Sequence, residues 1–161
     1  MSTPSSVLVA GACAAGLSTA EFLRRKGYQG SLTVLGAEPY LPYDRPPLSK
    51  QVLSGLWEPE RVQLRASAAL SALDAQFVLG DAAIGLDTAA RSVRTASGRT
   101  LRADTIVIAT GVRPRRLPCD AELDGVHVLR TLEDTLALRR DLVTSSRLAV
   151  VGDGVLRNPS T

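Results

Sequence analysis

A glycine-containing turn near the N-terminus has the composition of a phosphate-binding site. The stretch VLVAGACAAGLSTAEFLRRKG, residues 7–27, places Gly11, Cys13 and Gly16 in the spacing G-x-C-x-x-G after a short apolar run. Where a strand turns tightly into a helix, the free N–H groups of the first helical turn and the helix dipole attract phosphate oxygens. Gly11 permits the tight turn, and Gly16 allows the helix to lie close to the strand. The spacing therefore predicts a dinucleotide site.

An acidic residue follows this turn at the distance expected of a ribose ligand. Glu38 comes about 20 residues after the turn, just beyond a second apolar run at 31–36. Its carboxylate can accept a hydrogen bond from a ribose hydroxyl. Cys13 occupies the position that normally lets the pyrophosphate approach the backbone, so we expect its sulfur to displace the phosphates slightly without removing any N–H donor. Nucleotide binding is the favoured interpretation, and a βαβ unit without a ligand is the alternative.

Three local elements are expected to position this turn. Residues 6–10 read as a buried parallel strand, residues 14–26 as a helix, and residues 31–36 as a second strand. The apolar face of the helix is assigned to Leu17, Ala20, Leu23 and Phe22. Cations in the last turn and Gly27 after it suit the end of the helix. This unit has the length that a right-handed crossover requires.

The rest of the chain predicts an α/β fold with a Rossmann-like βαβ unit, a parallel sheet and a small antiparallel β-meander. A proline-rich loop is expected at 38–50 and a helical or mixed segment at 51–73. Short strands are expected at 76–80, 82–87, 92–96 and 100–103, with Ser97-Gly98 as a hairpin turn. Buried strands are expected at 105–111 and 147–154, and a helix at 131–143.

Composition excludes several classes of function. The 161 residues are 45% hydrophobic and carry a net charge of +3, without a long basic run interleaved with aromatic residues, so a nucleic-acid partner is not expected. Cys13 and Cys119 lie too far apart for a zinc pattern or a Cys-x-x-Cys pair, and no metal site is expected. No apolar stretch reaches the ~20 residues needed to cross a bilayer, so we expect no membrane association and a cytoplasmic protein.

Four further segments carry a family resemblance. They are YDRPPLSK at 43–50, LSGLWEPERVQLR at 53–65, TIVIATGVRPRRLP at 105–118 and GVHVLRTLEDTLALRRDL at 125–142. In this order they resemble the flavin-dependent ferredoxin reductases of the pyridine nucleotide–disulfide oxidoreductase superfamily. The resemblance covers nearly the whole chain. It implies that the first turn binds FAD, and that a ferredoxin-type iron–sulfur protein is the electron-transfer partner.

The resemblance also implies roles for residues around the adenosine diphosphate half of FAD. Gly11, Ala15 and Gly16 would hold the pyrophosphate, with Cys13 beside them. Glu38 would meet the adenosine ribose, and backbone groups of Ala83 would contact the adenine.

A second set of roles concerns the flavin half. Thr110 and Gly111 would pass close to the cofactor, Arg45 would neutralise a phosphate or pack near the flavin, and Arg130 would reach the ribityl-phosphate region. Lys50 is the expected catalytic residue. It would lie beside the isoalloxazine ring, where a cation stabilises negative charge on the reduced flavin.

Two residues with reactive or stacking side chains receive a structural interpretation. His127 is the only histidine and lies in the strand-like run GVHVL with no acidic partner in view, so we expect it to be structural. Trp57 is expected to pack rather than to form a stacking platform.

The second glycine-containing run departs from the family pattern. Gly152 and Gly154 are followed by Arg157 where a third glycine is expected, and Asn158-Pro159 disfavours the helix that should follow. We therefore expect residues 1–146 to be the N-terminal part of the FAD-binding domain and 147–161 an aborted start of the NAD(P)H-binding domain. Residues 148–151 are expected to be loose or to form an exposed apolar patch.

Three functions remain open on these grounds. The first is the FAD-binding portion of an NAD(P)H:ferredoxin oxidoreductase, truncated before the NAD(P)H site, with a second polypeptide as one source of the missing domains. The second is a non-catalytic remnant or nucleotide-binding module with an incomplete FAD site. The third is an NAD(P)-dependent dehydrogenase that uses the first turn, which the RPPLSK loop disfavours because the family places it beside a flavin.

Overall fold

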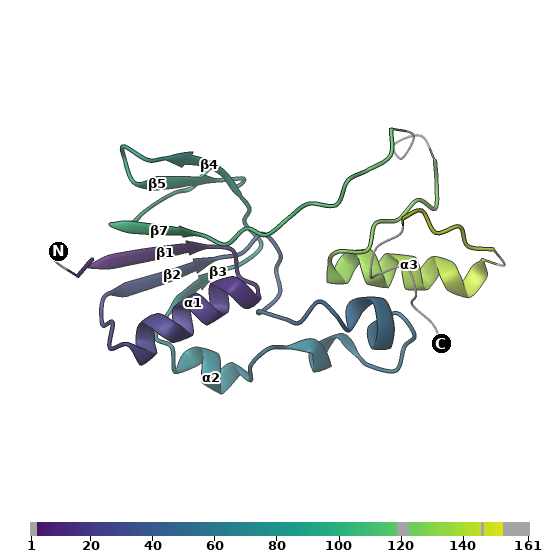
Figure 1. Cartoon of the computed structure of the whole chain (residues 1–161), viewed down its shortest axis with the longest axis horizontal. Helices are drawn as coiled ribbons and strands as arrows, with labels where there is room; N and C mark the ends of the chain where they lie inside the picture. Colours follow the sequence, from purple (N-terminus) through teal and green to yellow (C-terminus); the bar gives the residue numbers. More distant parts are fainter. Residues whose placement is uncertain (1–2, 119–122, 146, 153–161) are drawn as a thin grey trace. The chain divides into compact units, whose positions relative to one another are not determined.

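The computed structural model of the chain describes residues 3–118, 123–145 and 147–152 (Figure 1). These residues form two compact units, each built from two stretches of chain. The first unit contains residues 3–43 and 63–111, and the second contains residues 44–62 and the described residues from 112 onward.

A four-stranded parallel sheet forms the centre of the first unit. It has the strand order β3-β2-β1-β7, with β1 at Ser6–Ala10, β2 at Ser31–Leu35, β3 at Gln76–Val78 and β7 at Thr105–Ile108. Ala10 is in register with Leu35 of β2 and with Ile108 of β7. The carboxyl ends of these three strands therefore lie side by side, which is where open parallel sheets bind ligands.

One face of the parallel sheet is covered by α1, Ala14–Arg25 (Figure 1). Leu17 and Ala20 are buried there together with Val7 and Val9 of β1, as the apolar periodicity predicts. The assignment of Phe22 to this face is wrong, because the side chain is 48% exposed. Its ring instead lies beneath the cations of Arg25 and Lys26, each 5.5 Å from the ring centroid.

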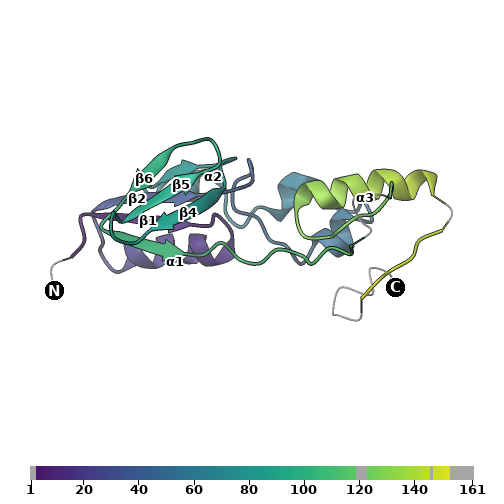
Figure 2. The same ribbon diagram turned by 90° about the horizontal axis from the view of Figure 1, so that it is seen from above.

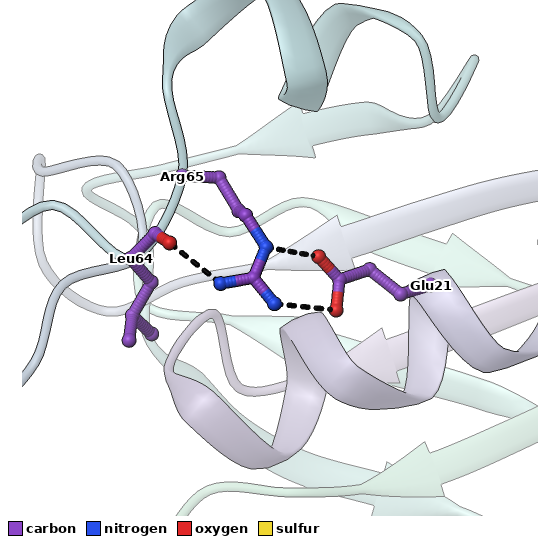
Figure 3. A network of polar contacts seen from close by, with 3 residues as sticks. All are labelled: Glu21, Leu64 and Arg65. Carbon is purple, nitrogen blue, oxygen red and sulfur yellow. Dashed lines mark hydrogen bonds and ion pairs between the residues drawn. The ribbon is translucent and has the colours of Figure 1, made fainter.

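A polar contact ties the exposed side of α1 to the segment that leads into α2, Ser67–Ser71. Nε and Nη2 of Arg65 donate to the Glu21 carboxylate at 2.7 and 3.2 Å, and Nη1 donates to the Leu64 carbonyl oxygen at 2.7 Å (Figure 3). The paired N–H groups of the Arg65 guanidinium thus hold the segment before α2 against α1.

A three-stranded antiparallel sheet packs on the other face of the parallel sheet (Figure 2). Its strands are β4, Ala83–Asp87, β5, Ser92–Thr95, and β6, Thr100–Arg102, in the order β4-β5-β6. The meander is confirmed, with Gly98 at φ +87° in the β5–β6 turn. Residues 76–80 do not belong to it. Their strand β3 joins the parallel sheet beside β2, because the segment containing α2 acts as a crossover.

Asp81, which precedes β4, contacts the turn between β5 and β6. Its buried carboxylate accepts hydrogen bonds from the Ser97 amide at 3.0 Å and from the Ser97 hydroxyl at 2.6 Å. The Ser97 hydroxyl bond is the main reason why the pKa of Asp81 lies below its ordinary value.

The expectation of a buried strand at 105–111 is only half right. The strand forms as β7, but within the described residues it is an edge strand that pairs with β1 alone. Ile108 is consequently 66% exposed. Continuous apolar sequence predicts burial on both faces, but it does not reveal whether both neighbouring strands are present.

The regular secondary structure in the described part of the second unit is helical. They are the π-helix η1, Leu48–Val52, the 3-10 helix η2, Pro59–Val62, and α3, Leu132–Thr144. The mixed segment expected at 51–73 is thus confirmed as parts of η1, η2 and α2. Thr131 begins α3 with a capping box, in which its hydroxyl accepts from the Asp134 amide at 3.1 Å. In the described part of the chain, no helix combines the length and the apolar character needed to cross a membrane.

The strand expected at 147–154 is not seen in its described portion. Residues 147–152 have no regular secondary structure, since no strand among the described residues offers them a ladder partner. Leu148, Val150 and Val151 are 55%, 56% and 77% exposed, which confirms the expected exposed apolar stretch. The remainder of the second glycine run, including Gly154, Arg157 and Asn158-Pro159, lies outside the described residues.

Candidate functional site

The turn after β1 depends on close backbone contacts that only glycine allows. Gly11 has φ +129°, and its amide donates to the Leu35 carbonyl oxygen at 2.7 Å. A Cβ at Gly11 would lie 2.0 Å from the Ala109 carbonyl oxygen, and one at Gly16 would lie 1.7 Å from the Gly11 carbonyl oxygen. The glycines therefore let the helix, the strand end and the segment after β7 meet at one point.

The amino end of α1 has the donor set that a diphosphate needs. The first main-chain bond of the helix runs from the Leu17 amide to the Cys13 carbonyl oxygen at 2.9 Å, so the amides before Leu17 precede the helical ladder. Cys13 is the N-cap residue and makes no side-chain cap hydrogen bond, and the first turn contains no acidic residue. Uncapped amides without a neighbouring negative charge suit an anion.

The thiol of Cys13 is directed to a neighbouring loop. Its Sγ donates to the Tyr43 carbonyl oxygen at 3.5 Å, and the residue is half-buried. The side chain at the atypical position of the turn thus contacts the main chain of the proline-rich loop.

Glu38 lies just beyond β2, and its carboxylate already has a protein donor. The hydroxyl of Tyr43 donates to Glu38 Oε2 at 2.6 Å. The main chain of Glu38 is fixed as well, because its carbonyl oxygen accepts from the Gly80 amide at 2.9 Å. Sequence reasoning missed Tyr43. The available signal was a tyrosine five residues after the acid, in a loop whose prolines limit its course.

The segment after β7 lies beside the glycine turn, whereas Ala83 belongs to the second sheet. The Thr110 amide nitrogen would be 3.0 Å from a Cβ on Gly11, and Gly111 follows at φ +74°. Ala83 begins β4 in register with Thr95, and its side chain packs against the cluster around Leu8. The structure therefore brings Gly11, Thr110 and Gly111 together. The expected contact of Ala83 with adenine stays a prediction.

The second unit contains the three expected basic residues. Nη1 of Arg45 donates to the carbonyl oxygen of Arg130, so two of them are in contact. Lys50 is exposed on η1, where its amide donates to the Pro47 carbonyl oxygen at 3.1 Å. Beside it, the buried side-chain oxygen of Gln51 has no hydrogen-bond partner among the described residues, which leaves an acceptor available to a donor.

His127 differs in detail from the sequence-based interpretation, whereas Trp57 packs as expected. His127 Nε2 lies 2.6 Å from Asp141 Oδ2, although the sequence offered no evident acidic partner. The partner lies on α3, and the run GVHVL is not a strand. The half-buried Trp57 ring packs under the Arg61 guanidinium, whose central carbon is 4.6 Å from the ring centroid.

Comparison with known proteins places these features in a family. The family model described as pyridine nucleotide-disulphide oxidoreductase matches residues 5–156. The chain is 40% identical over 156 residues to the ferredoxin–NAD(+) reductase component of the p-cumate 2,3-dioxygenase system of Pseudomonas putida, covering 94% of this chain and 38% of that protein. It is 34% identical over 160 residues to putidaredoxin reductase of Pseudomonas putida, covering 97% of this chain and 38% of that protein.

Solved structures agree with this relationship. A ferredoxin reductase of Rhodopseudomonas palustris superimposes with a TM-score of 0.80 at 33% identity, covering 87% of this chain and 35% of that one. Putidaredoxin reductase in its covalent complex with putidaredoxin gives a TM-score of 0.78 at 34% identity, covering 86% and 34% of the two chains. The chain thus spans less than two fifths of the length of these relatives.

Proposed function

Because the chain belongs to the pyridine nucleotide-disulphide oxidoreductase family, we propose that it is the FAD-binding portion of an NAD(P)H:ferredoxin oxidoreductase. The observation that carries the proposal is the turn from Gly11 to Gly16, with uncapped amides at the amino end of α1 and Glu38 beyond the neighbouring strand. A ferredoxin-type iron–sulfur protein is the proposed partner, in keeping with the names of the relatives.

The residues of the first unit suit the adenosine diphosphate half of the cofactor. The amides around Ala15 and Gly16 would donate to the pyrophosphate, and the helix dipole would add positive potential there. The Glu38 carboxylate would accept a hydrogen bond from the ribose, and the backbone of Ala83 would serve the adenine. Thr110 would contribute backbone groups beside Gly11.

The residues of the second unit would serve the flavin half. Bound FAD supplies the chemistry, because it accepts a hydride and releases electrons one at a time. Lys50 would hold a positive charge near the ring and so favour the reduced, negatively charged form. Arg45 and Arg130 would balance phosphate charge, and the contact between them would order both side chains.

We further propose the division of the chain that the family resemblance implies. Residues 1–146 would be the N-terminal part of the FAD-binding domain, and residues 147–161 would correspond to the beginning of the NAD(P)H-binding domain. With Arg157 in place of the third glycine, we expect this segment alone to bind neither NADH nor NADPH.

Titration of the purified chain with FAD tests the proposal. The expected result is quenching of flavin fluorescence and a shifted flavin absorbance band. Lys50→Ala should lower the reduction potential of the bound flavin, whereas Lys26→Ala, at the end of α1, should leave it unchanged. A colourless protein that takes up no FAD, or one that binds NADH tightly without flavin, would contradict the assignment.

A further inference from the structure

We propose that Tyr43 is a positioning residue that orients the Glu38 carboxylate and thereby makes the first unit selective for a ribose over a 2′-deoxyribose. The inference rests on the proposed function, because it takes the nucleotide half of the cofactor as the ligand of Glu38. Its basis is the hydrogen bond from the Tyr43 hydroxyl to Glu38 Oε2 at 2.6 Å.

The hydrogen bond gives the carboxylate a defined orientation. A hydroxyl that donates to a carboxylate oxygen at this distance forms a charge-assisted bond, which is stronger than one between neutral groups. A glutamate side chain otherwise turns about three bonds, and fixing it during binding costs free energy. With Oε2 held by Tyr43, that ordering is complete before the ligand arrives, and affinity rises accordingly.

Tyr43 can act in this way because it is itself fixed from several sides. The residue is only 5% exposed and forms an isolated antiparallel bridge with Gln63. Its ring meets that of Tyr40 edge-on, with centroids 6.4 Å apart. Its carbonyl oxygen accepts the Cys13 thiol at 3.5 Å. Cys13 in the phosphate turn and Glu38 beyond β2 are thus linked through a single tyrosine.

The chemistry of the ligand follows from the acceptor. An ionised carboxylate accepts hydrogen bonds and donates none, so it recognises a hydroxyl group. The 2′-hydroxyl of a ribose supplies that donor, and a 2′-deoxyribose lacks it. A 2′-deoxyribose keeps only its 3′-hydroxyl as a donor, so loss of the Tyr43 hydroxyl should weaken binding of the ribonucleotide more than binding of the deoxyribonucleotide. A general loss of packing would weaken both ligands equally.

The test compares binding of ADP and 2′-deoxy-ADP to the full chain by calorimetry. We expect the unsubstituted chain to prefer ADP, and Tyr43→Phe to lower ADP affinity about 5-fold with a smaller loss for 2′-deoxy-ADP, so that the ratio of the two affinities falls. Tyr28→Phe is the matched control, since it removes a hydroxyl from another buried tyrosine, one that donates to the Ser31 carbonyl oxygen at 3.1 Å, and it should leave the ratio of the two affinities unchanged.

The outcomes separate the inference from the function beneath it. If Tyr43→Phe leaves the ratio of the ADP and 2′-deoxy-ADP affinities unchanged, the inference is overturned. The proposed function still stands in that case, provided that the unsubstituted chain binds FAD and ADP. No binding of FAD or ADP by the unsubstituted chain overturns both. As a measurement that keeps the hydroxyl, 3-fluorotyrosine at position 43 should show a larger fluorine resonance shift with ADP than with 2′-deoxy-ADP, and equal shifts would overturn the inference.

Discussion

Gly16 lies at a point in α1 where even a methyl group has no room. The Gly16→Ala Cβ would come 1.7 Å from the backbone oxygen of Gly11, and backbone cannot swing aside as a flexible side chain does. We expect a loss of about 1–3 kcal/mol in the free energy of unfolding, measured by denaturant titration, together with weaker FAD binding. Gly98→Ala is the control. The added Cβ would contact no other atom and would only strain the turn between β5 and β6, so FAD affinity should not change.

Asp81 should make the first unit sensitive to acid. Its pKa is lowered in the folded chain, chiefly by the Ser97 hydroxyl, so the unfolded chain binds the proton more readily. The stabilisation is present above the ordinary aspartate pKa and is lost as the pH falls through the lowered native value. Asp81→Asn should flatten this part of a plot of unfolding free energy against pH. If the plot for Asp81→Asn keeps the slope of the unsubstituted chain, the lowered pKa of Asp81 is not the cause of the acid sensitivity.

Single residues show how far sequence reasoning reaches at this scale. Gly11 and Gly16 were predictable because their spacing follows from the geometry of one strand–turn–helix unit. The hydrogen bond between Tyr43 and Glu38 was not, since it depends on the course of an irregular loop. The contact of His127 with Asp141 was hidden for a similar reason, because the position of the run before α3 had no periodic pattern to indicate it.

At the scale of elements, Arg24 joins the end of α1 to two loops. Its guanidinium donates to the carbonyl oxygens of Leu73, Tyr28, Gly30 and Asp74 at 2.7, 2.7, 3.0 and 2.7 Å. A single ammonium group cannot reproduce this planar set of donors. We expect Arg24→Lys to lower the free energy of unfolding by about 2–3 kcal/mol, from lost hydrogen bonds to a charged group.

Arg25→Lys is the matched control for that substitution. Arg25 is the next residue of the same helix and is exposed, so the change should remain within about 0.5 kcal/mol. Both substitutions keep the positive charge, so a loss at Arg24 as small as that at Arg25 in the same denaturant titration would show that the donor geometry of the Arg24 guanidinium does not matter.

Elements with a local pattern were predicted within a residue or two of their ends. The strand at 6–10 and the helix beginning at residue 14 have clear periods and a glycine turn between them. The placement of β3 and the exposure of β7 depend on which strands become neighbours. Strand neighbours follow from long-range packing, and the apolar run at 105–108 is compatible with either a central or an edge position.

At the scale of the whole molecule, the uncharged edge strand β7 should promote self-association. Its residues Thr-Ile-Val-Ile carry none of the charges or prolines that usually protect an edge, and Ile108 is 66% exposed. Ile108→Lys should therefore reduce concentration-dependent light scattering. Val143→Lys introduces the same charge at an 83% exposed position on a helix, α3. Equal reductions in both variants would point to net charge as the cause.

The backbone pairing of Tyr43 with Gln63 closes the first unit at the point where residues 44–62 are inserted into it. The chain leaves and returns at one spot, since Tyr43 pairs with Gln63 and the Leu64 amide donates to the Pro42 carbonyl oxygen at 2.9 Å. We expect that residues 44–62 can be exchanged for a short glycine linker without moving Tyr43 and Gln63 on either side. Such a shortened protein would retain the parallel sheet and the nucleotide turn but lose Arg45 and Lys50. The affinity for the adenosine half of FAD could then be measured without the residues that we propose for the flavin half.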